Sequence, residues 1–293
     1  MRVLGTIALW LAACACGGSH ATPIDGGTDW NKPASTSRVE LVAPDGFERA
    51  FGQVVAGAGD INGDGYADFL ISTELADGGD PTTMTGAAHV YLGSALPGAA
   101  GWNGASASQR IDLISPDGVG GTFGSALASA GDVNGDGFAD FVVGNRQAGQ
   151  ARGAAHVYLG AASLDPSAWN GAVAHAARID LFNPDGPDAR FGASAGTVGD
   201  VNGDGFPDFV VGTFSDGFVS SAAGGNAHVY LGLASPSIAA WDGVAPAKRI
   251  DLANPAGPDS GFGNAVARVL RMRSDPSRAA CRRCSGTPSH RPG

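Results

Sequence analysis

The sequence is poor in cysteine and lysine and has no long apolar run. Its four cysteines lie near the two ends, at Cys14 and Cys16 and at Cys281 and Cys284, so the body between them is expected to fold without a disulfide. Only two lysines occur. The apolar run Val3–Leu11 is far shorter than the roughly 20 residues that a membrane-spanning helix needs. These absences exclude a disulfide-rich scaffold and a multi-span membrane protein.

Charge is distributed unevenly along the chain. Residues 268–293 contain seven arginines and one acidic residue, whereas the other 267 residues contain 11 basic and 27 acidic residues. The end segment therefore carries +6 and the body −16, which together give the net charge of −10. A body this acidic is not expected to bind a nucleic acid backbone, and it suits the uptake of divalent cations.

The N-terminus has the pattern of an export signal. Met1-Arg2 is a short basic start, and the apolar run that follows has the length of a signal-peptide core. Leu11-Ala12-Ala13-Cys14 resembles the bacterial lipobox, in which the cysteine is lipidated and becomes the mature N-terminus. We therefore expect a lipoprotein signal peptide over residues 1–16, a lipid on Cys14, and a flexible polar tether over residues 17–37. An ordinary cleaved signal peptide is the alternative.

Four landmarks recur in the same order along the body. The Phe-Gly pair begins at Phe51, Phe123, Phe191 and Phe262, with spacings of 72, 68 and 71 residues. A Trp-x-Gly turn, an Arg-Ile-Asp-Leu segment and an Ala-His-Val-Tyr-Leu-Gly segment repeat with it. A fixed order of unlike landmarks indicates tandem copies of one structural unit.

Each unit is predicted to contain four short strands. Apolar and polar residues alternate in Arg-Ile-Asp-Leu and His-Val-Tyr-Leu, which is the period of a strand. Phe141-Val142-Val143 and Phe209-Val210-Val211 are continuous apolar runs, typical of strands covered on both faces. No convincing amphipathic helix is evident. The expected fold is all-β, with β-propeller blades of four antiparallel strands.

A nine-residue loop rich in aspartate is expected between the first and second strands of three units. Oxygen side chains stand at its positions 1, 3, 5 and 9, a glycine at position 6 permits a sharp turn, and position 7 offers a backbone carbonyl. These oxygens nearly fill the shell of a Ca²⁺ ion, which takes six to eight oxygen ligands, so about three ions are expected. The candidate ligands are Asp60, Asn62, Asp64, Tyr66 and Asp68; Asp132, Asn134, Asp136, Phe138 and Asp140; and Asp200, Asn202, Asp204, Phe206 and Asp208.

Two alternatives apply to these loops. They could form Asx-turns without a metal. An EF-hand is unfavoured because its position 12 is a bidentate glutamate, where this chain has Ile71, Val143 and Val211.

The combined pattern resembles the FG-GAP repeats of integrin α-subunit propellers and their bacterial relatives, over residues 38–267. The resemblance implies blades over 51–113, 123–181 and 191–252, each opened by Phe-Gly and closed by Arg-Ile-Asp-Leu. It also implies that Arg38–Leu41 is the outer strand of a further blade and that Phe262-Gly263 opens another. The expected result is about three blades plus partial strands, an incomplete propeller of a seven-bladed type. The usual Gly-Ala-Pro after the second strand is missing, at residues 144–146 and 212–214.

Other conspicuous residues have simpler explanations. The recurring His89, His156 and His228 are expected at a strand position that faces a neighbouring blade, rather than at a transition-metal site. The tryptophans of the turns are expected to pack there, with stacking on sugars as the alternative. Cys281 and Cys284 form one pair, which cannot complete a four-ligand site.

The function that these features indicate is a Ca²⁺-stabilised binding or adhesion module for a protein or glycan ligand. No catalytic motif is present, so no enzyme is expected. The chain would reach the cell envelope through its lipid anchor or be secreted. The alternatives are the non-catalytic propeller of an extracellular hydrolase or lyase, and a truncated product without function. The hypothesis of a truncated product arises because residues 268–293 break the repeat. A change of reading frame would explain this segment, and a genuine basic tail is the alternative. The segment is expected to be disordered.

Overall fold

The computed structural model describes eleven segments of the chain, and the account below concerns these alone. They are residues 39–44, 50–74, 85–95, 98–104, 107–118, 121–170, 177–186, 189–214, 225–242, 246–255 and 262–266. The expected signal peptide with Cys14, the tether and the basic tail with Cys281 and Cys284 lie outside the described residues.

The described residues form an all-β structure of three four-stranded antiparallel sheets, each made by consecutive strands. Blade 1 contains β1 (Phe51–Gly59), β2 (Asp68–Thr73), β3 (Ala87–Tyr91) and β4 (Arg110–Ile114). Blade 2 contains β5 (Phe123–Gly131), β6 (Asp140–Asn145), β7 (Ala154–Tyr158) and β8 (Arg178–Phe182). Blade 3 contains β9 (Ser194–Gly199), β10 (Asp208–Gly212), β11 (Ala227–Tyr230) and β12 (Arg249–Leu252).

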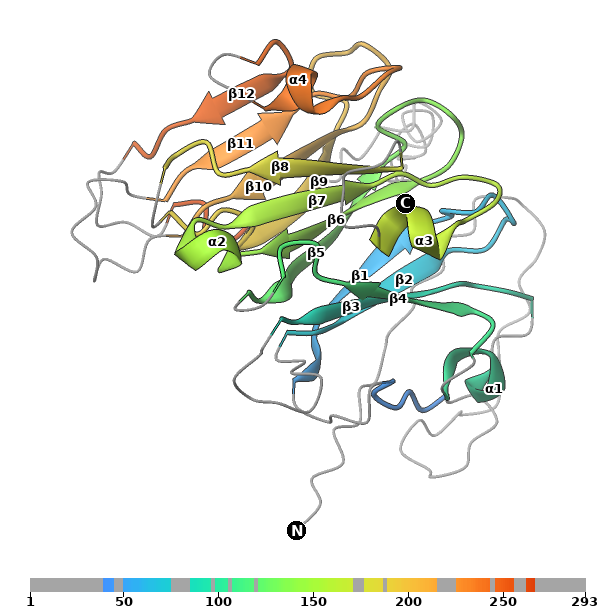
Figure 1. The fold of residues 1–293 in the computed structure, drawn as a ribbon. Coiled ribbons are helices and arrows are strands. Elements are labelled where there is room, and N and C mark those ends of the chain that lie inside the picture. The colour runs from blue at the N-terminus through green and yellow to red at the C-terminus, as the bar shows by residue number, and fades with distance from the viewer. Residues whose placement is uncertain are drawn as a thin grey trace, which may run out of the picture.

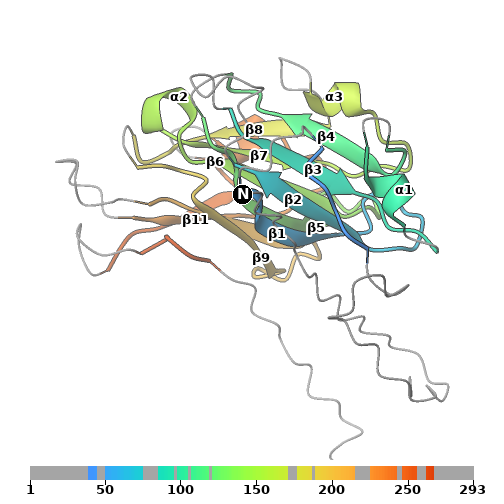
Figure 2. The ribbon, with the colours of Figure 1, turned by 90° about the horizontal axis from the view of Figure 1, so that it is seen from below.

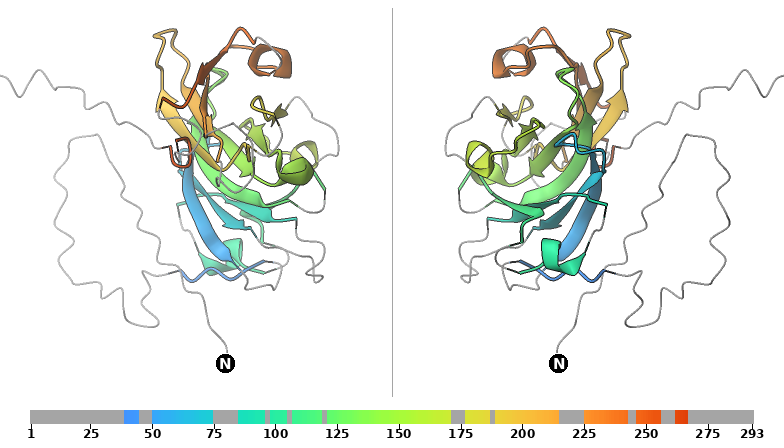
Figure 3. Two further views of the ribbon diagram at one scale, coloured as in Figure 1. Left: turned by 90° about the vertical axis from the view of Figure 1, so that its left-hand side faces the viewer. Right: turned by 90° about the vertical axis from the view of Figure 1, so that its right-hand side faces the viewer.

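The sheets follow one another in chain order, as the blades of an incomplete propeller do (Figure 1). Seen from below, the first strands β1, β5 and β9 gather on one side and the last strands β4 and β8 lie away from them (Figure 2). Four single-turn helices, α1 (Ala99–Trp102), α2 (Ala148–Ala151), α3 (Pro166–Asn170) and α4 (Ile238–Trp241), lie in the connections. Figure 3 shows the successive sheets from both sides.

The core lies between the blades because each sheet is apolar on both faces. Between blades 1 and 2, Val90 and Leu113 pack against a group that includes Phe141, Tyr158 and Trp169. An equivalent cluster joins blades 2 and 3. In each blade a Phe and a Tyr ring stack 5.0 Å apart and the Trp ring stands edge-on to them. The tryptophans are thus buried packing residues, as predicted, rather than an exposed sugar platform.

Two details differ from the expected strands. The described part of the predicted outer strand 38–41 forms no sheet pairing, because no third strand of its own blade lies beside it among the described residues. Its place is nevertheless that of an outer strand. The Asn103 side chain accepts a hydrogen bond from the Val42 N–H and donates one to the Glu40 carbonyl, as Asn170 does for Ile114 and Asp112.

The second difference is at Phe191. The third blade's first strand begins only at Ser194: Phe191 bridges Gly153 of blade 2, as Phe123 bridges Gly86 of blade 1, but unlike Phe123, which also pairs with Asn145, Phe191 pairs with no residue of its own second strand. Gly263, of the next Phe-Gly pair, lies against Gly212 in the way that Gly192 lies against Gly144. The Phe-Gly pairs at residues 123, 191 and 262 therefore attach the start of one blade to the blade before it.

Candidate metal-binding loops

The three aspartate-rich loops occupy the same place in each blade, as predicted. Each connects the first strand to the second, at residues 60–67, 132–139 and 200–207. The glycines at positions 4 and 6 have positive φ in all three loops, for example +73° at Gly63 and +87° at Gly65. Such a backbone favours glycine and lets the chain turn tightly around the side chain at position 1.

The first loop is closed by hydrogen bonds from its own backbone. Asp60 Oδ1 accepts the Gly63 N–H at 2.7 Å, and Asp60 Oδ2 accepts the Gly65 N–H at 2.8 Å. Asp64 Oδ1 accepts the Tyr66 N–H at 2.9 Å, while the Asn62 amide donates to Asp64 Oδ2 at 3.0 Å. These bonds bring the side chains at positions 1, 3 and 5 together in one turn.

The other two loops repeat this arrangement. Asp132 and Asp200 accept N–H groups at positions 5 and 6 of their loops, and Asp136 and Asp204 accept the N–H groups of Phe138 and Phe206. These are the local bonds of an Asx-turn.

The aspartate at position 9 is different, because it is buried and ties the loop to the rest of its blade. Asp68 Oδ2 accepts the Ile61 N–H at 2.8 Å, and Asp68 Oδ1 accepts the Gly93 N–H beyond β3 at 2.7 Å. Asp140 and Asp208 make the same two bonds in their blades. The position-9 carboxyl thus joins the start of the second strand, the aspartate-rich loop and the segment after the third strand of each blade.

Burial and nearby carboxylates alter the acidity of these groups. Burial is the main cause that raises the pKa of Asp68 to about 6 and that of Asp140 to about 7, and repulsion from positions 1 and 5 adds to it. Burial also raises the pKa of Asp208. Each loop therefore concentrates negative charge around a carboxyl that water does not stabilise.

The donor set of each loop suits a hard cation. All its side-chain ligands are oxygens, and a carboxylate has about four lone-pair sites, more than the hydrogen bonds it accepts here. In the described residues, however, no three His, Cys, Asp or Glu side chains converge closely enough to hold a metal ion. The Asn62 amide group, which points its N–H toward Asp64, would have to rotate to present its oxygen. The donor atoms thus fit Ca²⁺ chemically, and the side chains would have to move closer together to hold it.

Neighbouring loops touch one another, which the sequence does not reveal. A Cβ atom at Gly63 would lie 2.6 Å from the ring of Phe138, and one at Gly135 would lie 2.6 Å from the ring of Phe206. The Ala139 N–H also donates to the Asp60 carbonyl at 2.9 Å. The rings of Phe138 and Phe206 therefore rest on the loop of the preceding blade.

Two of the three histidines, His156 and His228, face the connections between blades as predicted, whereas the hydrogen-bond partners of His89 are Thr73 and Asp112 of its own blade. His156 Nδ1 lies 2.7 Å from Asp180 of its own blade, and Nε2 lies 2.9 Å from Asp117 in the connection from blade 1. His228 pairs in the same way with Asp251 and Asp185. We call each set of one histidine and two aspartates a clasp.

The His156 clasp is buried and charged. Burial alone would lower the pKa of His156, but its hydrogen bonds to Asp117 and Asp180 outweigh burial and raise the pKa above the ordinary 6.5. Burial opposes ionisation of Asp180 as well, yet hydrogen bonds from His156 and Arg178 lower its pKa to about 2. The sequence reasoning missed Asp117 and Asp185, although both recur in a Pro-Asp-Gly after the outer strand that could have signalled a shared role.

Comparison with known proteins agrees with this architecture. The family model described as FG-GAP repeat matches residues 51–91, 123–158 and 191–230, from the Phe-Gly pair to the end of the third strand in each blade. The chain thus carries three FG-GAP repeats and forms integrin-like propeller blades. In the described residues, no helix has the length and apolarity to cross a membrane.

The chain is also similar to integrin α subunits. It is 28% identical to integrin alpha-4 of Xenopus laevis over 165 residues, which is 56% of this chain and 14% of that protein. It is 32% identical to integrin alpha-PS5 of Drosophila melanogaster over 161 residues, 53% of this chain and 14% of that one. Human integrin alpha-7 is 40% identical over 101 residues, 32% of this chain and 8% of that one. The chain thus spans about a seventh or less of these relatives.

Proposed function

We propose that the chain is a Ca²⁺-binding adhesion module that recognises a protein or glycan ligand outside the cell and has no enzymatic activity. The observation that carries the proposal is the threefold recurrence of one all-oxygen loop at the same place in three blades. The likeness to integrin α subunits supports an adhesive role. The expected lipid on Cys14 would hold the module at the cell envelope.

The metal would act on the fold rather than on a reaction. When bound, Ca²⁺ would neutralise the carboxylates at positions 1, 5 and 9, with Asp64 central among them in the first loop. Asp68 already links its loop to the residue that follows β3, so a cation held there would fix the ends of three strands together. A ligand present at 100 times its Kd adds about 2.7 kcal/mol to the free energy of unfolding at each site.

The number of Ca²⁺ ions bound per chain tests the proposal. Equilibrium dialysis of the full chain against radiolabelled Ca²⁺ is expected to give three. Replacing Asp64, Asp136 or Asp204 with alanine should remove one ion each, because each substitution takes the central carboxylate from one loop. Asp165→Asn is the matched control, since Asp165 is an exposed acid in the connection before α3. A count of zero, or a count that the loop variants leave unchanged, would contradict the proposal.

A further inference from the structure

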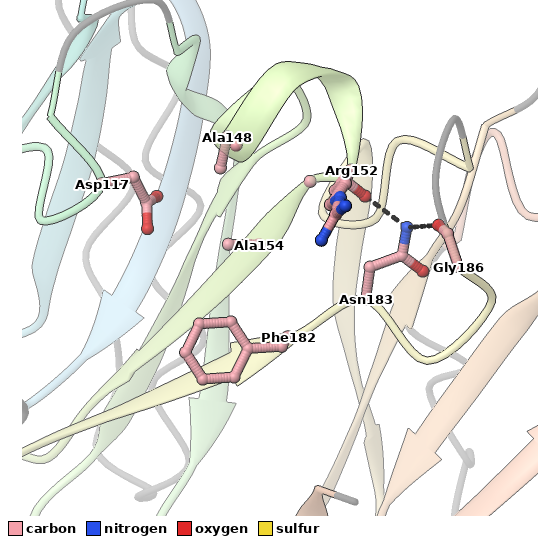
Figure 4. Close-up of a pocket in the computed structure, with 9 residues that line it drawn as sticks. Asp117, Ala148, Arg152, Ala154, Phe182, Asn183 and Gly186 are labelled. Carbon is pink, nitrogen blue, oxygen red and sulfur yellow. Dashed lines mark hydrogen bonds between the residues drawn. The ribbon is translucent and has the colours of Figure 1, made fainter.

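A pocket of about 490 Å³ lies at the end of blade 2 that is opposite its aspartate loop. The loop joins β5 to β6, whereas the pocket is formed around α2, which joins β6 to β7, and around the turn after β8 (Figure 4). Its size falls in the range of about 300–1,000 Å³ that is usual for small-ligand sites. None of the metal-loop residues lines it.

Three different side chains surround this space. The ring of Phe182, the carboxylate of Asp117 and the guanidinium of Arg152 border the same hollow (Figure 4). The Phe182 side chain is one of the large apolar groups left exposed, at 56%. At the equivalent position, directly after the Arg-Ile-Asp-Leu segment, blade 1 has Ile114 and blade 3 has Ala253. The aromatic ring therefore distinguishes this blade from the other two.

The polar groups of the pocket retain hydrogen-bonding capacity. Asp117 Oδ2 contacts the Asn145 amide at 2.7 Å and His156 Nε2 at 2.9 Å, whereas Oδ1 has no partner within the described segments. Arg152 is exposed, and its guanidinium makes no ion pair or hydrogen bond with any residue that the structure describes. A fixed acceptor and a free donor thus stand on the two sides of an apolar ring.

The scaffold holds Asp117 and the backbone around the pocket in place. The Asn183 amide donates to the carbonyls of Arg152 and Gly186, which ties α2 to the turn after β8. Asp117 is fixed by the His156 clasp. Groups that are positioned before binding lose little conformational entropy when a ligand arrives, which favours affinity.

We propose that this pocket binds a hexose unit of a neutral saccharide. A hexose has an apolar C–H face that can lie on the Phe182 ring, and its hydroxyls both donate and accept hydrogen bonds. They would donate to Asp117 Oδ1 and accept from Arg152. One carboxylate and one guanidinium leave the pocket without a net charge, which favours an uncharged ligand over an ionic one. The inference names the ligand class of the adhesion module and rests on that proposed function, while its site is separate from the metal loops.

The test is binding of the full chain, in Ca²⁺, to an array of immobilised neutral oligosaccharides. At least one class of oligosaccharide is expected to bind, with competition by the same sugar free in solution. Phe182→Ala and Arg152→Met should each weaken binding about tenfold, equivalent to about 1.4 kcal/mol. Ile114→Ala is the matched control, because Ile114 is equally exposed at the same position of blade 1 but does not line the pocket. It should bind like the parent chain.

The outcomes separate this inference from the proposed function. If no neutral oligosaccharide binds while three Ca²⁺ ions do, the saccharide inference is wrong and the metal proposal stands. If saccharide binds but no Ca²⁺ does, the metal proposal is wrong and the saccharide inference stands. Saccharide binding that Phe182→Ala leaves unchanged, in a variant whose melting temperature matches that of the parent, would refute the assignment of this pocket.

Discussion

Blades 2 and 3 have nearly the same sequence pattern but different surroundings. In β8 of blade 2, Ile179 and Leu181 are 7% and 0% exposed, because the aromatic face of blade 3 covers them. In β12 of blade 3, the equivalent Ile250 and Leu252 are 44% and 42% exposed. The Arg-Ile-Asp-Leu motif thus specifies a strand and its apolar face, whereas burial of that face requires the next blade.

The same contrast extends to the aspartate loops. Val133 in the loop of blade 2 is buried, and its carbonyl accepts the Leu233 N–H of blade 3 at 2.9 Å. Val201, at the same position of the third loop, is 54% exposed. A loop therefore contacts a neighbouring blade on this side only where another blade follows it among the described residues.

The largest expected difference between the two blades concerns their histidine clasps. In blade 2 the side chain of Asp180 is only 16% exposed, whereas Asp251 in blade 3 is 53% exposed. His156→Gln should lower the free energy of unfolding by about 3–5 kcal/mol, the usual cost of removing one member of a buried ion pair. His228→Gln should cost clearly less, because water can reach Asp251. Urea unfolding of both variants measures the difference, and equal costs would show that the neighbouring blade does not matter.

A slightly smaller difference is expected for the outer-strand leucines. Leu181→Ala should cost about 2–5 kcal/mol, since it leaves a cavity between two blades. Leu252→Ala should cost about 1 kcal/mol, because much of that side chain is already in water. Parallel denaturation curves give both values. If Leu252→Ala proves as costly as Leu181→Ala, the face of blade 3 must be covered in solution.

The smallest expected effect concerns the contact between loops. With Asp136→Ala and Asp204→Ala in place, only the first loop should bind Ca²⁺. Adding Phe138→Ala should then weaken that site about fivefold, at the low end of typical couplings between sites, because the Phe138 ring rests on Gly63. Phe206→Ala is the matched control, since its ring rests on Gly135 of the second loop. Calorimetric titration should show no change for this control, and a weakening as large as that caused by Phe138→Ala would contradict the coupling.

The sequence was sufficient for the parts of the structure that depend on local pattern. The period of two located most strands, and the glycines of the loops located the turns between first and second strands. Contacts between blades were harder to predict, because residues that meet there are far apart in the chain. Asp117 is 39 positions from His156, and no local period connects them. The pocket around Phe182 was not predicted for the same reason, since α2 and the turn after β8 meet only in the folded sheet.

Two strand boundaries also could not be predicted from the local sequence pattern. Residues 38–41 carry the motif of an outer strand, but a strand needs a paired neighbour, which the described residues do not supply. Phe191 has a backbone bridge to Gly153 of blade 2 but no backbone pairing with the second strand of its own sheet. In both cases the tertiary surroundings, and not the propensity of the residues, decide whether a strand forms.

The most direct test of the account is the thermal unfolding of the full chain in saturating Ca²⁺ and in EGTA. The three-loop proposal predicts a higher melting temperature in Ca²⁺. A rise of about 5–10 °C is expected for each loop held at 100 times its Kd, from about 2.7 kcal/mol per site in a domain of this size. Asp64→Ala, Asp136→Ala and Asp204→Ala combined should abolish the rise. A melting temperature that is the same in Ca²⁺ and EGTA would contradict the account.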